Sequence, residues 1–285
     1  MARPLEMLII DDDKEFVESL YADAQRSQIL LTHKSNLEDG QLFLKSSKAR
    51  KLSGVILDVV CMTGKDDEVA KSSFITEALD FFARDASHLP VVILTGEPDQ
   101  YKNLSELFKH KKVYSKGRDE EEMLFFLKEE ALKLDRVKTI NKYKDIFEIT
   151  EEYFDADTED ALINCLSTLN VSDKTQINNN LACIRRLQEK IYIELNKRKP
   201  DLVPTEYIGG DVTVRDILKH LREGSCVDKK TNDFAYAVYT VCSDFGAHTV
   251  NRKQDSSVSK YTVHTIAYAL LDLFLWFKKV VNQDV

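Results

Sequence analysis

The sequence lacks the features that would direct a protein into or across a membrane. Its first residues, MARPLEMLII, contain no long apolar core of the kind found in signal peptides. No stretch reaches the roughly 18 uninterrupted apolar residues of a membrane span. The longest apolar stretch, residues 266–277, is too short and is interrupted by Asp272. We therefore expect a cytoplasmic protein without a membrane partner.

The cysteines lack any regular spacing. There are five, an odd number, and no two of them form a CxxC pair. Disulfide frameworks and zinc sites need paired or regularly spaced cysteines, so neither is predicted. In an acidic chain, such a set is typical of reduced thiols in a cytosol, most of them small core residues. They are Cys61, Cys165, Cys183, Cys226 and Cys242.

A basic excess is also absent, since the net charge is −8. Chains dominated by nucleic-acid binding are normally basic, and no helix-turn-helix pattern is found here. The one basic cluster of the second half, residues 197–199, follows a predicted helix, where cations offset the helix dipole. The sequence thus argues against nucleic acid as a partner.

At 285 residues, the chain is long enough for two domains. Its first half alternates apolar runs with segments of helical periodicity, which predicts a doubly wound α/β domain with a five-stranded parallel sheet. The runs GVILDVV and PVVIL are continuously apolar, as expected of strands covered on both faces. Strands are predicted at residues 5–10, 29–32, 54–60, 90–94 and 112–115, and helices at 14–27, 37–49, 75–86, 101–110 and 120–134.

Apolar residues then recur every three or four positions from 124 to 147, with no Gly or Pro between them. This pattern predicts that the last helix of the first domain continues as a connecting helix, which could be a core helix or a dimerising signalling helix. Beyond Thr150 only helical patterns remain, at residues 161–169, 175–197, 214–221, 233–245 and 262–281. The predicted organisation is a domain over 1–130, a connecting helix over 131–150 and an all-α domain over 151–285.

Polar residues follow four of the predicted strands. Asp11 and Asp12 come after the first, Asp58 stands near the end of the third, Thr95 follows the fourth and Lys116 the fifth. The carboxyl ends of parallel strands meet on one rim, where three carboxylates repel one another unless a cation joins them. Hard oxygen ligands favour Mg²⁺. With a lysine and a hydroxyl beside it, the rim suits phosphoryl transfer onto a carboxylate, and Asp58 is the best acceptor.

The segments LIIDDDKEF, GVILDVV, VVILTGE and VYSKG resemble, in order, the signature segments of response-regulator receiver domains of two-component signalling. The resemblance covers residues 5 to 135 and implies a flavodoxin-like fold. It implies that Asp12, Asp58 and the backbone carbonyl of Val60 coordinate Mg²⁺, with Asp11 acting through water.

The resemblance further implies that Asp58 is the phosphoacceptor and that Thr95 and Lys116 bind the phosphoryl group. Tyr114 matches the aromatic residue whose inward rotation reports phosphorylation in that family. Two departures are visible. Gly117 replaces the usual proline after the lysine, and the loop at residues 61–74, CMTGKDDEVAKSSF, is enlarged and acidic. Its acidic residues could lie near the metal or be solvated.

The second domain carries a weaker resemblance. The segment AYAVYTVCSDFGAHTV and the last predicted helix resemble HEPN-like and abortive-infection-type helical domains, many of which are RNases with an Arg, four residues, then a His. Here that spacing gives Ser243 and His248, so the arginine is missing. His248 could act as a general acid or base, or could pack at a helix end.

The sequence therefore predicts a two-component response regulator that is phosphorylated by a histidine kinase or a small phosphodonor. Apart from its own phosphoryl transfer and hydrolysis, it is not expected to be an enzyme. The helical output domain would act through protein contact or as a homodimer. The alternative is a receiver-gated HEPN-like RNase or phage-defence effector, and a further alternative for the first domain is a degenerate receiver used only for docking.

Overall fold

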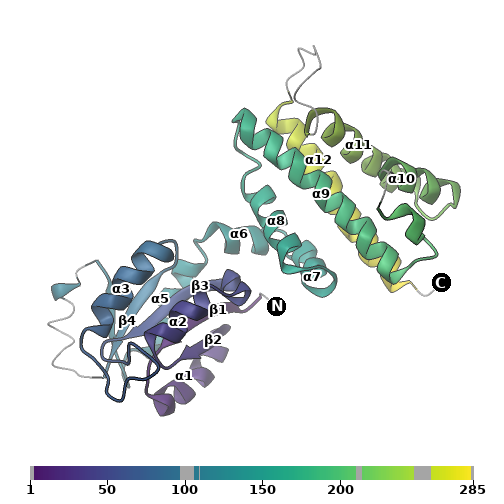
Figure 1. Ribbon diagram of the computed structural model, residues 1–285. Helices are drawn as coiled ribbons and strands as arrows, with labels where there is room; N and C mark the ends of the chain where they lie inside the picture. The colour runs from purple at the N-terminus through teal and green to yellow at the C-terminus, as the bar shows by residue number, and fades with distance from the viewer. Residues whose placement is uncertain (1–2, 97–105, 109, 210–213, 247–257, 284–285) are drawn as a thin grey trace. The chain divides into compact units, whose positions relative to one another are not determined.

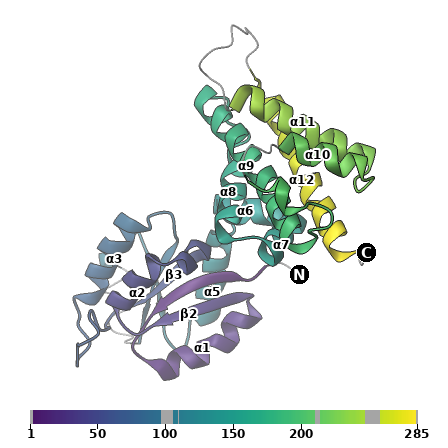
Figure 2. The same ribbon diagram turned by 45° about the vertical axis from the view of Figure 1, so that its right-hand side comes forward.

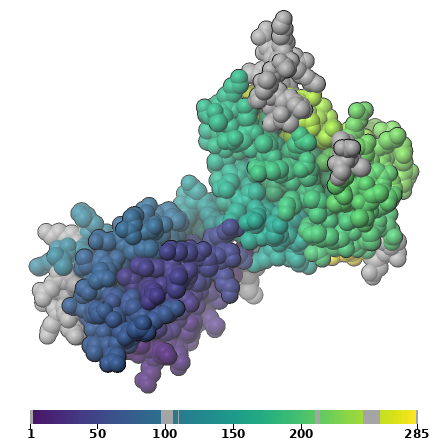
Figure 3. Space-filling model, viewed as in Figure 1, coloured from purple at the N-terminus to yellow at the C-terminus, as the bar shows by residue number. Residues whose placement is uncertain are grey.

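The computed structural model describes residues 3–96, 106–108, 110–209, 214–246 and 258–283 (Figure 1). The chain divides into two compact units, Met1–Asn141 and Lys142–Val285. In the space-filling view the first unit runs from purple to teal and the second from teal to yellow, so each consists of contiguous sequence (Figure 3). This division falls within the predicted connecting helix over 131–150. The predicted domain limits at residues 130 and 151 stay a prediction.

The first unit is built on the predicted sheet. Its five strands are all parallel and lie in the order β2-β1-β3-β4-β5. This order confirms the five-stranded parallel α/β fold and is consistent with a flavodoxin-like receiver fold. The central strand is buried along its whole length, because helices cover both faces of the sheet. The strands are β1 (Leu5–Ile10), β2 (Ile29–Lys34), β3 (Leu52–Asp58), β4 (Val91–Thr95) and β5 (Lys112–Ser115).

Two apolar clusters, one on each face of the sheet, form the core of this unit. One joins the sheet to α2 and α3, and the other joins it to α1 and α5 (Figure 1). Both α1 and α2 start at a side-chain cap, Asp13 and Asn36 respectively, which accepts a backbone N–H of the first turn. The helices are α1 (Lys14–Arg26), α2 (Leu37–Leu44), the 3₁₀ helix η1 (Ser47–Lys51), α3 (Phe74–Asp85) and α5 (Glu120–Ala131).

Several sequence predictions need correction in this unit. The helix predicted over 37–49 is two elements, α2 and η1, because the chain leaves the α-helix at Lys45. The strand predicted over 54–60 begins and ends two residues earlier, at Leu52 and Asp58. Most of the helix predicted over 101–110 lies outside the described residues.

The prediction of one continuous connecting helix is wrong. The chain forms three helices instead, α5, α6 (Asp135–Lys142) and α7 (Lys144–Tyr153). After Ala131, the backbone forms the i to i+3 hydrogen bonds of a 3₁₀ turn. One of them runs from the Leu134 N–H to the Ala131 carbonyl at 3.1 Å. At the second break, the backbone of Tyr143 is not helical and its buried ring packs against Tyr268. The periodicity of apolar residues does not reveal these breaks, because the apolar spacing continues through them.

The second unit is all-helical within the described residues. Helices α9, α11 and α12 pack side by side, α8 packs on α9, and α7 packs on α12 (Figures 1 and 2). The five helices predicted beyond Thr150 are all present, with ends that differ by up to five residues. They are α8 (Ala156–Ser167), α9 (Lys174–Arg198), α10 (Val214–Glu223), α11 (Lys229–Gly246) and α12 (Lys260–Asn282), and a short 3₁₀ helix, η2 (Thr205–Tyr207), lies between α9 and α10.

The apolar side chains of α9 and α12 form the core of this unit. On α12 the buried side chains include Leu271, Phe274, Trp276 and Phe277. On α9, the apolar stripe whose spacing would suit either a core or a homodimer seam is buried within the chain and is therefore core. Its residues are Ile184, Leu187, Ile191 and Leu195. Among the described residues, no helix combines the length and the apolar character needed to cross a membrane.

Candidate functional site

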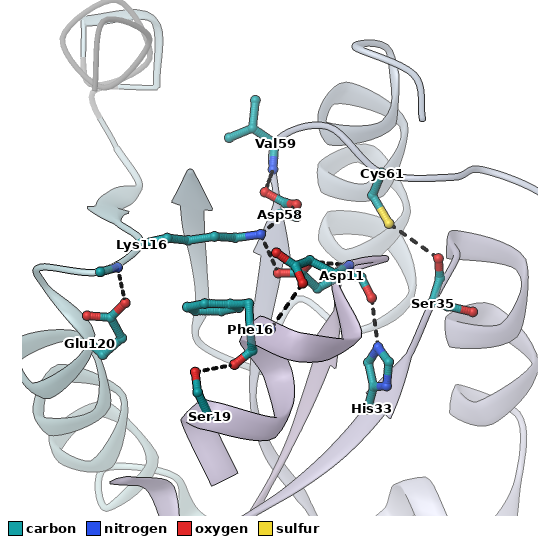
Figure 4. A network of polar contacts seen from close by, with 12 residues as sticks. Asp11, Phe16, Ser19, His33, Ser35, Asp58, Val59, Cys61, Lys116 and Glu120 are labelled. Atoms are coloured by element: carbon teal, nitrogen blue, oxygen red, sulfur yellow. Dashed lines mark hydrogen bonds and ion pairs between the residues drawn. The ribbon is translucent and has the colours of Figure 1, made fainter. Parts of the chain in front are cut away.

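The first unit brings Asp11, Asp58 and Lys116 together at the carboxyl ends of the strands (Figure 4). Asp11 directly follows β1, Asp58 is the last residue of β3, and Thr95 is the last residue of β4. These strands are consecutive neighbours in the sheet, so their ends form one rim. Lys116 follows β5, and its backbone N–H donates to the Thr95 carbonyl at 2.8 Å. All four residues therefore belong to one site.

Local hydrogen bonds fix the two buried carboxylates. Asp11 is fully buried, and one of its oxygens accepts the backbone N–H of Asp13 at 3.0 Å. Asp58 is 7% exposed, and its Oδ1 accepts the backbone N–H of Val59 at 2.7 Å. Because Asp13 also caps α1, the start of that helix and the orientation of Asp11 are set together.

The Lys116 ammonium lies between these carboxylates. Its Nζ is 2.7 Å from Asp11 Oδ2 and 2.9 Å from Asp58 Oδ2, and its side chain is 13% exposed (Figure 4). The ring of Phe16 lies 4.8 Å from the same nitrogen and helps to hold it. Burial lowers the pKa of Lys116, but the two neighbouring carboxylates raise it by more, so the pKa of Lys116 lies above its usual value.

The acid groups carry more negative charge than one lysine can neutralise. Burial and the neighbouring Asp11 raise the pKa of Asp58 to about 7, against the opposing effect of Lys116. Burial likewise raises the pKa of Asp11. Both shifts mean that the fully ionised cluster is costly in the protein alone and would be relieved by another cation.

The cluster has the composition of a magnesium site. Asp11, Asp12 and Asp58 each present a carboxylate oxygen, and these oxygens all lie within 4.8 Å of one another. Mg²⁺ usually takes one or two carboxylates directly and keeps several waters, through which a further carboxylate can act. Asp11 Oδ2, although ion-paired with Lys116, accepts no hydrogen bond of good geometry from the described residues. The donor set therefore fits a divalent cation.

The remaining predicted residues lie around this cluster. Val60 is two residues beyond Asp58, at the start of the following loop. Tyr114 is buried on β5, in the apolar cluster that includes α1 and α5, and its ring centroid is 6.3 Å from that of Phe126. Gly117 has a φ of 77°, a left-handed conformation that glycine adopts readily, which explains a glycine where the resembled family has proline.

The enlarged loop after Asp58 is internally bonded. Asp67 accepts the backbone N–H groups of Thr63 and Gly64 at 3.0 and 2.8 Å, and pairs with Lys71 at 2.6 Å. These contacts hold the pKa of Asp67 below its usual value. Lys65 reaches back to Asp39 at 3.0 Å, which ties the loop to α2. Asp67 is thus a loop anchor, which neither sequence interpretation of this acidic segment had anticipated.

Sequence reasoning missed two contributors to the rim. His33 donates from Nε2 to the Asp11 carbonyl at 2.7 Å, and Phe16 lies beside Lys116 (Figure 4). The position of Phe16, about one helical turn after Asp12, was the available signal for its proximity. No comparable signal existed for His33, because the strand predicted over 29–32 stopped before it.

The described residues of the second unit contain no comparable cluster. Among all described residues, only Asp11, Asp12 and Asp58 form a group of three or more carboxylate, histidine or cysteine side chains close enough to share a metal ion. His248, the tentative output-domain residue, lies outside the described residues. Its spacing partner, Ser243, lies on α11.

The sequence was also compared with known proteins. No protein-family model matches the chain, and no curated protein matches it either.

Proposed function

We propose that the first unit is a receiver domain, which accepts a phosphoryl group on Asp58 with Mg²⁺ bound at Asp11, Asp12 and Asp58. The observation that carries the proposal is the Lys116 ammonium between Asp11 and Asp58, 2.7 and 2.9 Å away, at the carboxyl ends of a parallel sheet. The receiver resemblance of the motifs supports the same assignment. A docking-only receiver would not need this full set of charged groups.

In the proposed reaction, a carboxylate oxygen of Asp58 attacks the phosphorus of the donor. The new O–P bond forms as the bond to the leaving group breaks, and the leaving group departs with the electron pair. Lys116 pairs with the transferred phosphoryl oxygens, and the Thr95 hydroxyl donates to one of them. The metal, when bound, neutralises charge on those oxygens. The donor is a histidine kinase or a small acyl phosphate.

The helical unit would carry the output through contact with another protein or a second copy. Its last helix presents three exposed apolar side chains at intervals of seven residues, so they lie along one face. They are Tyr261, Tyr268 and Leu275, which are 71%, 47% and 41% exposed. Rows of exposed apolar residues are common at protein interaction sites.

The test is phosphorylation of the full chain by acetyl phosphate and Mg²⁺, followed by intact mass measurement. We expect one added phosphoryl group in the wild type and none in Asp58→Ala. Asp66→Ala is the matched control, since Asp66 is an exposed acid of the neighbouring loop, and it should be modified like the wild type. An unmodified wild type, or equal modification of Asp58→Ala, would overturn the proposal.

A further inference from the structure

A cavity lies inside the helical unit, far along the chain from the acidic rim. It opens to solvent and is lined by residues of α9, α10 and α11 (labelled in Figures 1 and 2) and by residues 207–209 of the chain that follows α9. Its volume is about 240 Å³, whereas one water molecule needs roughly 10–15 Å³. The space is therefore large enough for a small organic molecule.

Contacts within the unit fix the connection that closes one side of the cavity. Asn196 on α9 donates from Nδ2 to the Val203 carbonyl at 2.7 Å and to Thr205 Oγ1 at 3.3 Å. The ring of Tyr207 packs against that of His220 on α10, with the ring centroids 4.7 Å apart and the ring planes tilted by 34°. These contacts tie Val203, Thr205 and Tyr207 to two different helices, so the described part of this wall is held in place by the protein itself.

Most of the cavity wall is apolar or aromatic. Tyr192 from α9 and the aliphatic residues Val214 and Ile217 from α10 are buried and form its inner surface. Tyr207 and Tyr239 add two partly exposed rings. Small-molecule sites typically combine such a surface with a few polar groups that fix the orientation of the ligand.

One pair of opposite charges lies on the same wall. Arg185 and Glu189 are one helical turn apart on α9, and the Arg185 Nε lies 3.1 Å from Glu189 Oε1. Their side chains are 36% and 40% exposed, which places the pair at the solvent side of the cavity. A ligand with a single charge would satisfy one member and repel the other, whereas a ligand with both charges can pair with each.

We propose that this cavity binds a small zwitterion with an apolar body, namely a free α-amino acid with an aromatic or branched side chain. Arg185 would pair with the ligand carboxylate and Glu189 with its ammonium group, while the side chain fills the space beside Tyr192 and Ile217. The site lies in the output unit and does not depend on phosphorylation of Asp58. It would give that unit a second input, a metabolite signal.

Isothermal titration of the full chain with L-phenylalanine tests the proposal. We expect saturable binding, and binding about tenfold or more weaker for phenylpropionate and phenethylamine, which each lack one of the two charges. Glycine, which lacks the apolar body, should give no measurable binding. Absence of binding by L-phenylalanine, or equal binding of all four compounds, would overturn the proposal.

Variants locate the binding on this wall. Arg185→Gln and Glu189→Gln should each weaken L-phenylalanine binding about tenfold. The matched control is Arg186→Gln, which removes the neighbouring arginine, a residue outside the cavity wall, and should bind like the wild type. Circular dichroism checks that each variant keeps its helices. If the folded Arg185→Gln and Arg186→Gln variants bind equally well, the cavity is not the site.

Discussion

The two units differ in where their buried polar residues lie. In the first, Asp11, Asp58, Thr95 and Ser115 are buried at the ends of neighbouring strands and meet on one rim. In the second, the buried polar residues are spread over several helices. Several of them form a side-chain hydrogen bond with a residue three positions away in the sequence. Examples are Thr150 with the Phe147 carbonyl, Thr158 with Asp155 and Thr231 with Asp228.

This difference follows from the two architectures. A parallel sheet gathers residues from distant parts of the sequence at one edge, where their charges act together. In the helical unit, several buried hydroxyls bond to residues of the same helix or its first cap, and the Gln188 amide of α9 donates to the Ala235 carbonyl of α11 at 2.8 Å. Among the described residues, these groups stabilise helices and their packing without forming an acidic cluster like that of the first unit. We infer that the chemistry belongs to the first unit and that the second provides recognition.

The largest expected effect tests whether the two units are independent. Phe277 is fully buried in the second unit, and Phe277→Ala should lower the free energy of unfolding of that unit by about 3–5 kcal/mol. Urea denaturation followed by circular dichroism measures this loss. Leu275→Ala, on the exposed face of the same helix, is the control and should have a much smaller effect. Acetyl phosphate labelling of folded Phe277→Ala should match the wild type, and a parallel loss would contradict this separation.

The next largest effect is expected at Lys116, whose ammonium lies between Asp11 and Asp58. Lys116→Met should slow phosphorylation by acetyl phosphate about a hundredfold, because it removes a charged donor to the transferred group. The control is Lys112→Met on the same strand, since Lys112 is exposed. The initial phosphorylation rates of the two variants are compared by intact mass measurements. Equal rates for the two variants would show that the rim charge has no role in transfer.

How much the sequence could predict also differs between the units. The strands of the first unit were found because buried parallel strands are continuously apolar, and the rim followed from what comes after each strand. The role of Asp67 could not be predicted, because its partners are backbone N–H groups that come close only when the loop folds. The break at Tyr143 was missed since tertiary packing overrides a helical pattern that carries no Gly or Pro.

In the second unit, helical periodicity located the helices but not the cavity. The cavity depends on the positions of Val203 and Tyr207 after α9, which contact Asn196 and His220 of two different helices. Arg185 and Glu189 have the ordinary spacing of a surface ion pair, so nothing in the sequence distinguishes them from many others.

A smaller effect should be visible in the pH dependence of stability without metal. The pKa of Asp58 rises from 3.8 to about 7 on folding, so the stability linked to its protonation is present below about pH 4 and lost as the pH rises through 7. Asp58→Asn stays neutral and should melt above the wild type at about pH 8, with a smaller difference at about pH 5. Thermal melts in chelator measure this, and a difference that does not vary with pH would contradict the raised pKa.

The smallest effect separates the loop anchor from the rim. Asp67→Ala should speed backbone hydrogen exchange at residues 63–71, because Thr63 and Gly64 lose their acceptor. Its phosphorylation rate should stay within about twofold of the wild type, as expected when no group that contacts the transferred phosphoryl is removed. Asp66→Ala, which alters an exposed neighbour, should change neither property. A large loss of phosphorylation in Asp67→Ala would make that residue part of the rim.

The most direct test of the central claim is to locate the modified residue. An acyl phosphate on aspartate can be reduced by borohydride to homoserine, which peptide mass spectrometry places in the sequence. After treatment with acetyl phosphate and Mg²⁺, we expect homoserine at position 58 and unchanged aspartate at positions 11 and 12. Homoserine at position 11 or 12, or none at all in a folded protein, would contradict the assignment of Asp58 as the phosphoacceptor.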